Sequence, residues 1–306
     1  MSGNNQGQQG QQGQQGEQGH AGTGIGNLFP DRIDLPFVSM ESTAIGGFPK
    51  PVSDPIFRSG QTGAFGRRWT AAWRAWHVLA EFTDRPAWRN RQQEADGPPA
   101  LEGGLALPGW RTRLTTGGTD LVGAVDQEID ALVRFAEDER ADALGEILSQ
   151  SDEFVSDFLA LLCATASSYP ATNAVMQAAS LVAGLAVQHF KKINDRPRPS
   201  QVCPALRPPL EVPGHAAYPS GHATQAFLIG NCLDAVLTGT PAAMALPVVA
   251  ALAARIAHNR EIAGFHYPSD TAAGQELAQT LLPELLEAPS LVEMLAHARA
   301  EWESPT

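Results

Sequence analysis

The sequence predicts an all-α protein, a helical bundle with an irregular N-terminal arm. Two observations lead to this fold class. Apolar residues recur at spacings of three and four along most of the chain after Arg67, and no stretch shows the two-residue alternation of a half-buried strand. With 306 residues and 43% hydrophobic content, the chain has enough apolar side chains for one large domain or two modest ones.

The N-terminal third is predicted to be mostly irregular. Residues 1–26 repeat glycine and glutamine, a composition typical of a disordered tail. Residues 27–118 are rich in proline and glycine and are expected to form an irregular arm that contains one tryptophan-rich helix. In that helix, Trp69, Trp73 and Trp76 share one side, which favours a place in the core.

The remaining residues, 119–306, are expected to form the main helical domain. Leu121, Val125, Ile129 and Leu132 follow the helical spacing and open its first helix. Alanine and leucine dominate the later helices, which indicates packing around a shared core. The predicted helices cover residues 121–136, 140–149, 153–168, 171–191, 222–237, 242–262, 270–286 and 290–302.

Charge and hydropathy exclude several kinds of partner. The formal net charge of −12 argues against a nucleic-acid binder, whose contact face is basic. The uncharged stretches 158–190 and 235–254 contain prolines and polar residues, so no transmembrane span is expected. The first basic residue is Arg32, and no apolar stretch of about 7–15 residues precedes it, so a cytoplasmic location without a signal peptide is expected. Homo-oligomerisation through the irregular arm stays open.

Basic residues gather where the predicted helix 171–191 ends. Lys191, Lys192, Arg196 and Arg198 fall within eight positions of an otherwise acidic chain. Two prolines in the same run end the helix, because proline cannot continue it. The helix dipole accounts for one or two cations at a helix end but not for four, which indicates an anion site.

A second segment, Pro219-Ser220-Gly221-His222, stands directly before a predicted helix. A helix start exposes free backbone N–H groups, and glycine lets an anion approach them closely. The Ser220 hydroxyl adds a donor, and His222 is placed to exchange a proton with the bound anion. An ordinary serine cap on the helix is the alternative for this segment.

The third segment contains Arg260, His266 and Asp270. If a helix restarts near Tyr267, the histidine and the aspartate lie about one turn apart, and the carboxylate can fix the tautomer of the imidazole. The alternative is a core histidine paired with a capping aspartate.

In this order and spacing, K-x6-R-P, P-S-G-H and R-x5-H-x3-D, the three segments resemble the type-2 phosphatidic acid phosphatase and vanadium haloperoxidase superfamily. The resemblance covers roughly residues 150–285 and implies a helical bundle, in agreement with the periodicity. Asn259 stands where the family commonly has serine, at a position that is not a direct ligand. The residues that carry the resemblance are Lys191, Arg198, Pro199, Pro219, Ser220, Gly221, His222, Arg260, His266 and Asp270.

For a phosphatase, the resemblance implies hydrolysis of a phosphomonoester or diphosphate through a phosphohistidine, with no metal and no cofactor. His266 would attack phosphorus, Asp270 would orient its ring, and His222 would protonate the leaving group and then activate water. The substrates expected are small-molecule or lipid-like phosphate esters. The phosphate oxygens would be held by Lys191, Arg198, Ser220, Gly221 and Arg260.

For a haloperoxidase, the same residues would hold vanadate as a cofactor, with His266 as the vanadium ligand, for oxidation of bromide or iodide by hydrogen peroxide. The compact spacing between the three segments and the run from Gly264 to Asp270 favour the phosphatase. His215, seven residues before His222, favours the haloperoxidase unless it is a loop histidine at the edge of the site. A non-catalytic oxyanion-binding protein is a third hypothesis.

Overall fold

The computed structural model describes residues 69–97 and 100–303, and every regular element within them is helical. The all-α class predicted from the sequence is confirmed. The helices described below belong to one compact unit, which begins at Ala71.

The predicted disordered tail, residues 1–26, lies outside the described residues, and so does the predicted arm as far as residue 68. From residue 71 onward the arm forms three helices, α4 to α6, of which α4 packs against helices of the C-terminal part. The predicted boundary between arm and main domain, at residue 118, stays a prediction.

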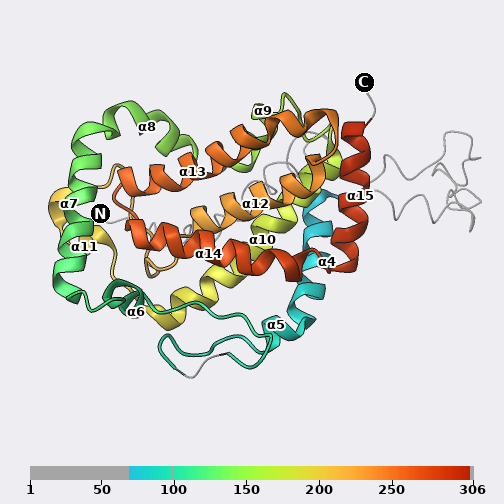
Figure 1. Ribbon diagram of the computed structural model, residues 1–306. Helices are drawn as coiled ribbons and strands as arrows, with labels where there is room; N and C mark the ends of the chain where they lie inside the picture. The colour runs from blue at the N-terminus through green and yellow to red at the C-terminus, as the bar shows by residue number, and fades with distance from the viewer. Residues whose placement is uncertain (1–68, 98–99, 304–306) are drawn as a thin grey trace, which may run out of the picture. The chain divides into compact units, whose positions relative to one another are not determined.

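Figure 1 shows the helices in their arrangement. Their bounds in chain order are α4 Ala71–Asp84, α5 Pro86–Arg89, α6 Trp110–Thr115, α7 Leu121–Asp138, α8 Arg140–Ser149, α9 Val155–Leu161, α10 Pro170–Asn194, α11 Pro199–Val202, α12 Gly221–Leu237, α13 Leu246–Ile262, α14 Pro268–Leu285 and α15 Pro289–Glu303. Two short 3-10 helices, η1 Pro204–Leu206 and η2 Pro241–Ala245, complete the set in the described residues.

The core is built on α10 and α12. Helix α10 packs against α4, α12 and α15, while α12 also packs against α13 and α14. Alanine is the commonest buried residue of α10, and such small side chains let helix axes approach closely. The two helices therefore hold the ends of their neighbours in fixed positions.

Helix α14 lies against the first turn of α12 because position 274 is a glycine. A Cβ atom there would lie 2.9 Å from both the Cβ of Ala223 and the backbone oxygen of Ser220, closer than side chains tolerate. The backbone N–H of Ser220 also donates to the carbonyl oxygen of Asp270 over 3.0 Å. The starts of α12 and α14 are thus joined, which brings the second and third sequence segments together.

The helix predicted over residues 153–168 ends earlier, at Leu161. Cys163 takes a left-handed backbone conformation with φ of 52°, which a helix does not accommodate. Beyond it, Thr165 and Ser168 bond to each other's backbone N–H through their hydroxyls, over 3.0 and 3.1 Å. Serine and threonine compete in this way with the hydrogen bonds of a helix, and this explains the break.

The predicted core position of the tryptophan stripe is wrong for the part of α4 that the structure describes. Trp73 and Trp76 are 60% and 43% exposed, whereas Ala75, Val78 and Phe82 are buried. The helix offers two apolar faces, and the face with the smaller side chains packs against α10, where helices approach closely.

The expectation that the chain has no transmembrane span is corrected by the structure. Two of the described segments, Pro170–Val202 and Pro241–Ile262, are long and apolar enough to cross a membrane, with mean hydropathies of 1.2 and 1.4. Within the bundle, 61% of the first apolar window is buried, against 22% of the second. The expectation failed because Pro170 and Pro247 were taken as interruptions, whereas both stand in the first turn of a helix, where proline is accommodated.

Candidate active site

Three of the predicted cations converge in the interior of the protein. Lys191 lies in the last turn of α10, Arg198 directly before α11, and Arg260 in the last turn of α13. Their exposed fractions are 2%, 2% and 4%. Lysine and arginine are almost never buried this deeply without a charged partner, so their surroundings decide what they do.

The side chains of these cations contact backbone carbonyl oxygens. Lys191 Nζ donates to Ala216 and Ala217 over 2.6 and 2.9 Å. Arg198 donates from Nε to His215 over 3.0 Å and from Nη1 to Phe265 over 2.8 Å.

The third cation is held more loosely. The only hydrogen bond of the Arg260 side chain among the described residues is a long one, 3.4 Å to Ile147, and its guanidinium lies over the ring of Phe265 at 4.8 Å. Across the described part of the chain, none of these three cations forms an ion pair with a carboxylate.

Burial lowers the pKa values of all three cations, and repulsion by Arg198 adds to the shift of the other two. Burial, and then the charge of Arg198, lowers the pKa of Lys191 well below its usual range. Burial lowers the pKa of Arg198 to about 10, and burial with the charge of Arg198 lowers that of Arg260 to about 10. A multiply charged anion between them would relieve this repulsion, since it supplies the missing negative charge.

The Ser220–Gly221 turn opens α12 at this site. Ser220 is fully buried and is the N-cap, and its Oγ accepts from the N–H of Ala223 over 3.4 Å. The hydroxyl proton is still available to a further acceptor, and the N–H of Gly221 has no acceptor within the helix. The alternative of an ordinary serine cap is therefore compatible with anion binding by the same turn.

His266 and Asp270 meet where α14 begins. The Nδ1 atom of His266 lies 3.3 Å from Oδ2 of Asp270, and the same oxygen accepts from the N–H of Tyr267 over 3.0 Å. Asp270 is fully buried and His266 is 4% exposed. Gly264, with φ of 76°, turns the chain between α13 and α14.

His222, the second residue of α12, contacts the segment between α8 and α9. Its Nε2 lies 3.0 Å from the carbonyl oxygen of Gln150, and its ring lies 5.1 Å from that of Phe154. Burial, followed by the charge of Arg260, lowers the pKa of His222 to about 3. Asn259 donates to the Gln150 side chain over 2.9 Å and so helps to hold this segment in place.

His215, the secondary candidate, lies beside Arg198. The Nη2 atom of Arg198 lies 2.9 Å from Nδ1 of His215, which places this histidine in the cation cluster. Burial of the ring atoms and the charges of Lys191 and Arg198 lower the pKa of His215 to about 4. The structure thus brings together all nine candidate residues, although no contact by itself assigns a role.

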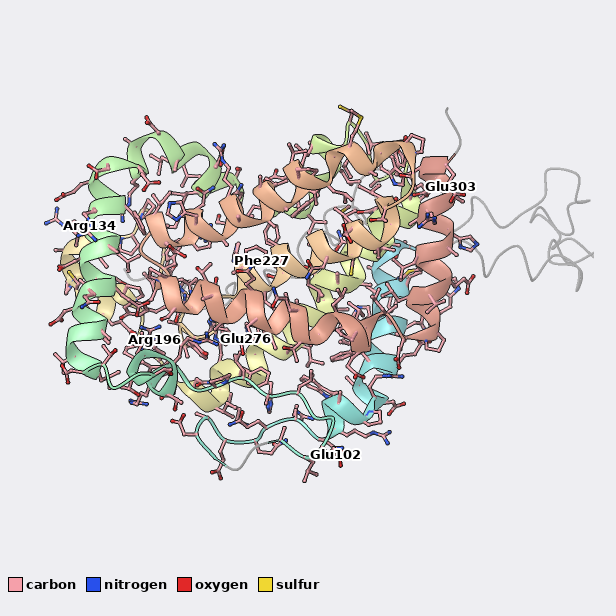
Figure 2. The ribbon with its side chains drawn as sticks, in the orientation of Figure 1. Glu102, Arg134, Arg196, Phe227, Glu276 and Glu303 are labelled. Atoms are coloured by element: carbon pink, nitrogen blue, oxygen red, sulfur yellow. The ribbon has the colours of Figure 1, made fainter. Side chains whose placement is uncertain are left out.

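Arg196 and Glu128 also belong to this region, although neither is among the candidate site residues predicted from the sequence. Figure 2 shows Arg196 beside the start of α14, where it is 1% exposed. Its Nη1 donates to Oδ1 of Asp270 and its Nη2 to Oε2 of Glu128, each over 2.6 Å. Arg196 stood out only as part of the basic run, and Glu128 carried no signal, because it lies on the amphipathic helix α7.

The family model described as the PAP2 superfamily matches residues 173–282, a segment that contains all of the candidate residues. The predicted resemblance is confirmed. Two curated relatives are 34% identical to the chain over 107 residues; both are decaprenylphosphoryl-5-phosphoribose phosphatases, from two strains of Mycobacterium tuberculosis. The aligned part is 35% of this chain and 55% of each relative, so the chain spans about half the length of the relatives it matches.

Proposed function

We propose that this protein is a phosphatase that hydrolyses a phosphomonoester or a diphosphate through a phosphohistidine intermediate. The observation that carries the proposal is the set of three buried cations, Lys191, Arg198 and Arg260, which form no ion pair with a carboxylate of the described residues and whose charges all act on His266. The PAP2 superfamily match and the names of the two relatives support phosphatase activity in general.

Binding would replace the contacts of these cations with backbone carbonyls by contacts with phosphate oxygens. Arginine holds two oxygens at once in a planar fork, and lysine supplies a point charge. The Ser220 hydroxyl and the N–H of Gly221 would complete the donor set at the start of α12. Stabilising dispersed negative charge is the main task in phosphoryl transfer, so this donor set matches the reaction.

In the first step, Nε2 of His266 forms a bond to phosphorus while the bond from phosphorus to the ester oxygen breaks. The leaving oxygen takes a proton from His222. In the second step, a water oxygen attacks phosphorus, His222 takes its proton, and the P–N bond breaks to release inorganic phosphate. Asp270, which stays hydrogen-bonded to Nδ1, stabilises the positive charge on the phosphorylated ring.

The protonation of His222 is tied to substrate binding. Burial and the charge of Arg260 keep the ring neutral in the empty site. A phosphate dianion bound to Arg260 offsets that charge and raises the proton affinity of His222. The acid needed in the first step would therefore form only when a substrate is in place.

The test is phosphate release from an aryl phosphate by the purified full chain. We expect turnover in the wild type, its loss in His266→Ala, and a phosphoprotein that is recovered from a rapid base quench of the wild type and loses its phosphate on later treatment with acid. His297→Gln, at an exposed histidine of α15, serves as the control and should keep the wild-type rate. Turnover that survives His266→Ala would disprove the phosphohistidine route.

A second candidate function is favoured by the contact between His215 and Arg198. Vanadate is a tetrahedral oxyanion like phosphate. The three buried cations would donate hydrogen bonds to its oxygens, and Nε2 of His266 has a lone pair that could bind vanadium. Bound vanadate would supply activation of hydrogen peroxide for halide oxidation. Peroxide-dependent bromination by the vanadate-loaded wild type, lost in His215→Ala, would support this function. Binding of vanadate without either activity would instead support the non-catalytic oxyanion-binding protein.

A further inference from the structure

The carboxylate of Asp270 uses both oxygens inside the protein. Oδ2 faces Nδ1 of His266 at 3.3 Å and the N–H of Tyr267 at 3.0 Å. Oδ1 faces Nη1 of Arg196 at 2.6 Å. The plane of the carboxylate is thus set from two sides, and the side that does not face His266 is set by Arg196.

Arg196 is itself held from several directions. Its Nη1 also donates to Oγ of Ser269 over 2.7 Å, and its guanidinium lies 3.7 Å from the centre of the Tyr267 ring and 5.0 Å from that of Trp110. Glu128 accepts from Arg196 through Oε2 and from the N–H of Ser269 through Oε1, over 2.6 and 2.8 Å. One glutamate therefore holds both the arginine and the first turn of α14.

Arg196 differs from the three cations of the anion site in its charged partners. Arg196 forms ion pairs with two carboxylates, Glu128 and Asp270, whereas the three cations of the site form none with the residues that the structure describes. An arginine whose charge is already compensated by two carboxylates has little attraction left for a phosphate. In the basic run at the end of α10, Lys191 and Arg198 therefore belong to the anion site, whereas Arg196 binds carboxylates.

We propose that Arg196 and Glu128 form a positioning pair that holds Asp270, and through it the Nδ1–H tautomer of His266, ready for attack by Nε2. The proposal rests on the proposed phosphatase function for its kinetic consequences. Its structural content, the tautomer of His266, does not depend on activity. Glu128 lies in α7, outside the segment that the family model matches, and it contacts Arg196 directly.

Removing Arg196 has a defined effect on protonation. Asp270 would lose its ion-pair partner Arg196, and a buried carboxylate whose charge is less compensated stabilises an imidazolium more strongly. Burial opposes protonation of His266, and so do the charges of Arg198, Lys191 and Arg260; all of these would remain. At low pH the rate falls because His266 is protonated and cannot attack. In Arg196→Met this fall in the plot of kcat/KM against pH should therefore occur at higher pH.

The experiment compares Arg196→Met, Arg196→Lys and Glu128→Gln with a matched control, Arg85→Met. Arg85 also has two carboxylate partners, Glu284 and Glu287, but lies away from the site at α5. For Arg196→Met we expect kcat to fall roughly 10–100-fold with KM within about twofold, as for residues that orient a functional imidazole. Arg196→Lys should recover part of kcat, and Arg85→Met should match the wild type.

A second measurement reads the tautomer directly, by ¹⁵N NMR of the His266 ring in the purified chain. The wild type should show a protonated Nδ1 and a free Nε2, and Arg196→Met a mixture of tautomers or an imidazolium. An unchanged His266 spectrum in Arg196→Met, or an equal loss of kcat in Arg85→Met, would overturn the proposal. If the wild type lacks phosphatase activity, the proposed function fails, whereas the spectrum alone still decides the positioning role.

Discussion

Nη1 of Arg198 lies 3.1 Å from Nε2 of His266, the atom that would attack phosphorus in the proposed reaction. A guanidinium only donates, so Nε2 must carry the lone pair and Nδ1 the proton, which faces Asp270. One arginine therefore connects the two halves of the proposed chemistry. It favours the tautomer of His266 whose Nε2 carries the lone pair, and it would bind the phosphate that Nε2 attacks.

Arg198→Lys should remove this double role. Lysine keeps the charge but cannot reach the His215 and Phe265 carbonyls and Nε2 of His266 at the same time, as the arginine fork does. We expect kcat/KM for an aryl phosphate to fall roughly 100-fold or more. Arg299→Lys, in an exposed pair on α15, is the control. A loss of less than about threefold in Arg198→Lys would show that charge alone suffices.

Asp270→Asn should reduce both activity and stability. The change leaves Arg196 buried with Glu128 as its single carboxylate partner, and breaking a buried ion pair costs about 3–5 kcal/mol. It also lets the His266 ring choose the wrong tautomer, for which a rate loss of roughly 10⁴-fold has precedent in triads. Urea unfolding and steady-state kinetics measure the two effects. The control is Asp84→Asn, at an exposed partner of Arg89, which should change the free energy of unfolding by no more than about 1 kcal/mol.

Gly274→Ala should move α14 away from the start of α12. The added Cβ would meet Ala223 and the backbone of Ser220 at 2.9 Å, and overpacking of this kind costs about 1–3 kcal/mol. The contact between the first turns of α12 and α14 would be lost, which displaces Ser220 from Asp270, so kcat should fall as well. Gly145→Ala, in α8, is the matched control, since its Cβ meets nothing within 4 Å. That variant should gain about 0.5–1 kcal/mol in a urea titration. Equal stabilities for the two variants would contradict the close contact.

Stability should fall as the pH is lowered from 6.5 toward 3, in part through His222. The pKa of this histidine is lowered to about 3 in the folded protein by burial and by Arg260, while its ordinary value is 6.5. Between these values the unfolded chain binds a proton that the folded chain does not, which favours unfolding. His222→Gln removes this contribution, so its free energy of unfolding should drop less than that of the wild type between pH 7 and pH 5. A parallel drop in both proteins, measured by urea titration, would show that His222 ionises freely in the folded state.

The amino-acid sequence alone predicted most of the long helices and the candidate residues of the anion site. The apolar spacing that predicts α7, α10 and α12 is a property of short stretches of sequence, so it can be recognised without the tertiary structure. The three segments likewise carry their chemistry within short runs of residues. For this reason the all-α class and the resemblance to the PAP2 superfamily could both be predicted.

The tertiary structure alone decided which groups hold the site in place. Arg196 and Glu128 are 68 positions apart, and His222 and Gln150 are 72 apart, so no periodicity relates them. Which face of α4 is buried, and how much of Pro241–Ile262 stays exposed, likewise depend on which helices pack together. Local spacing specifies a helix and its apolar face, whereas the partner of a buried charge is fixed only when distant helices pack and exclude water around it.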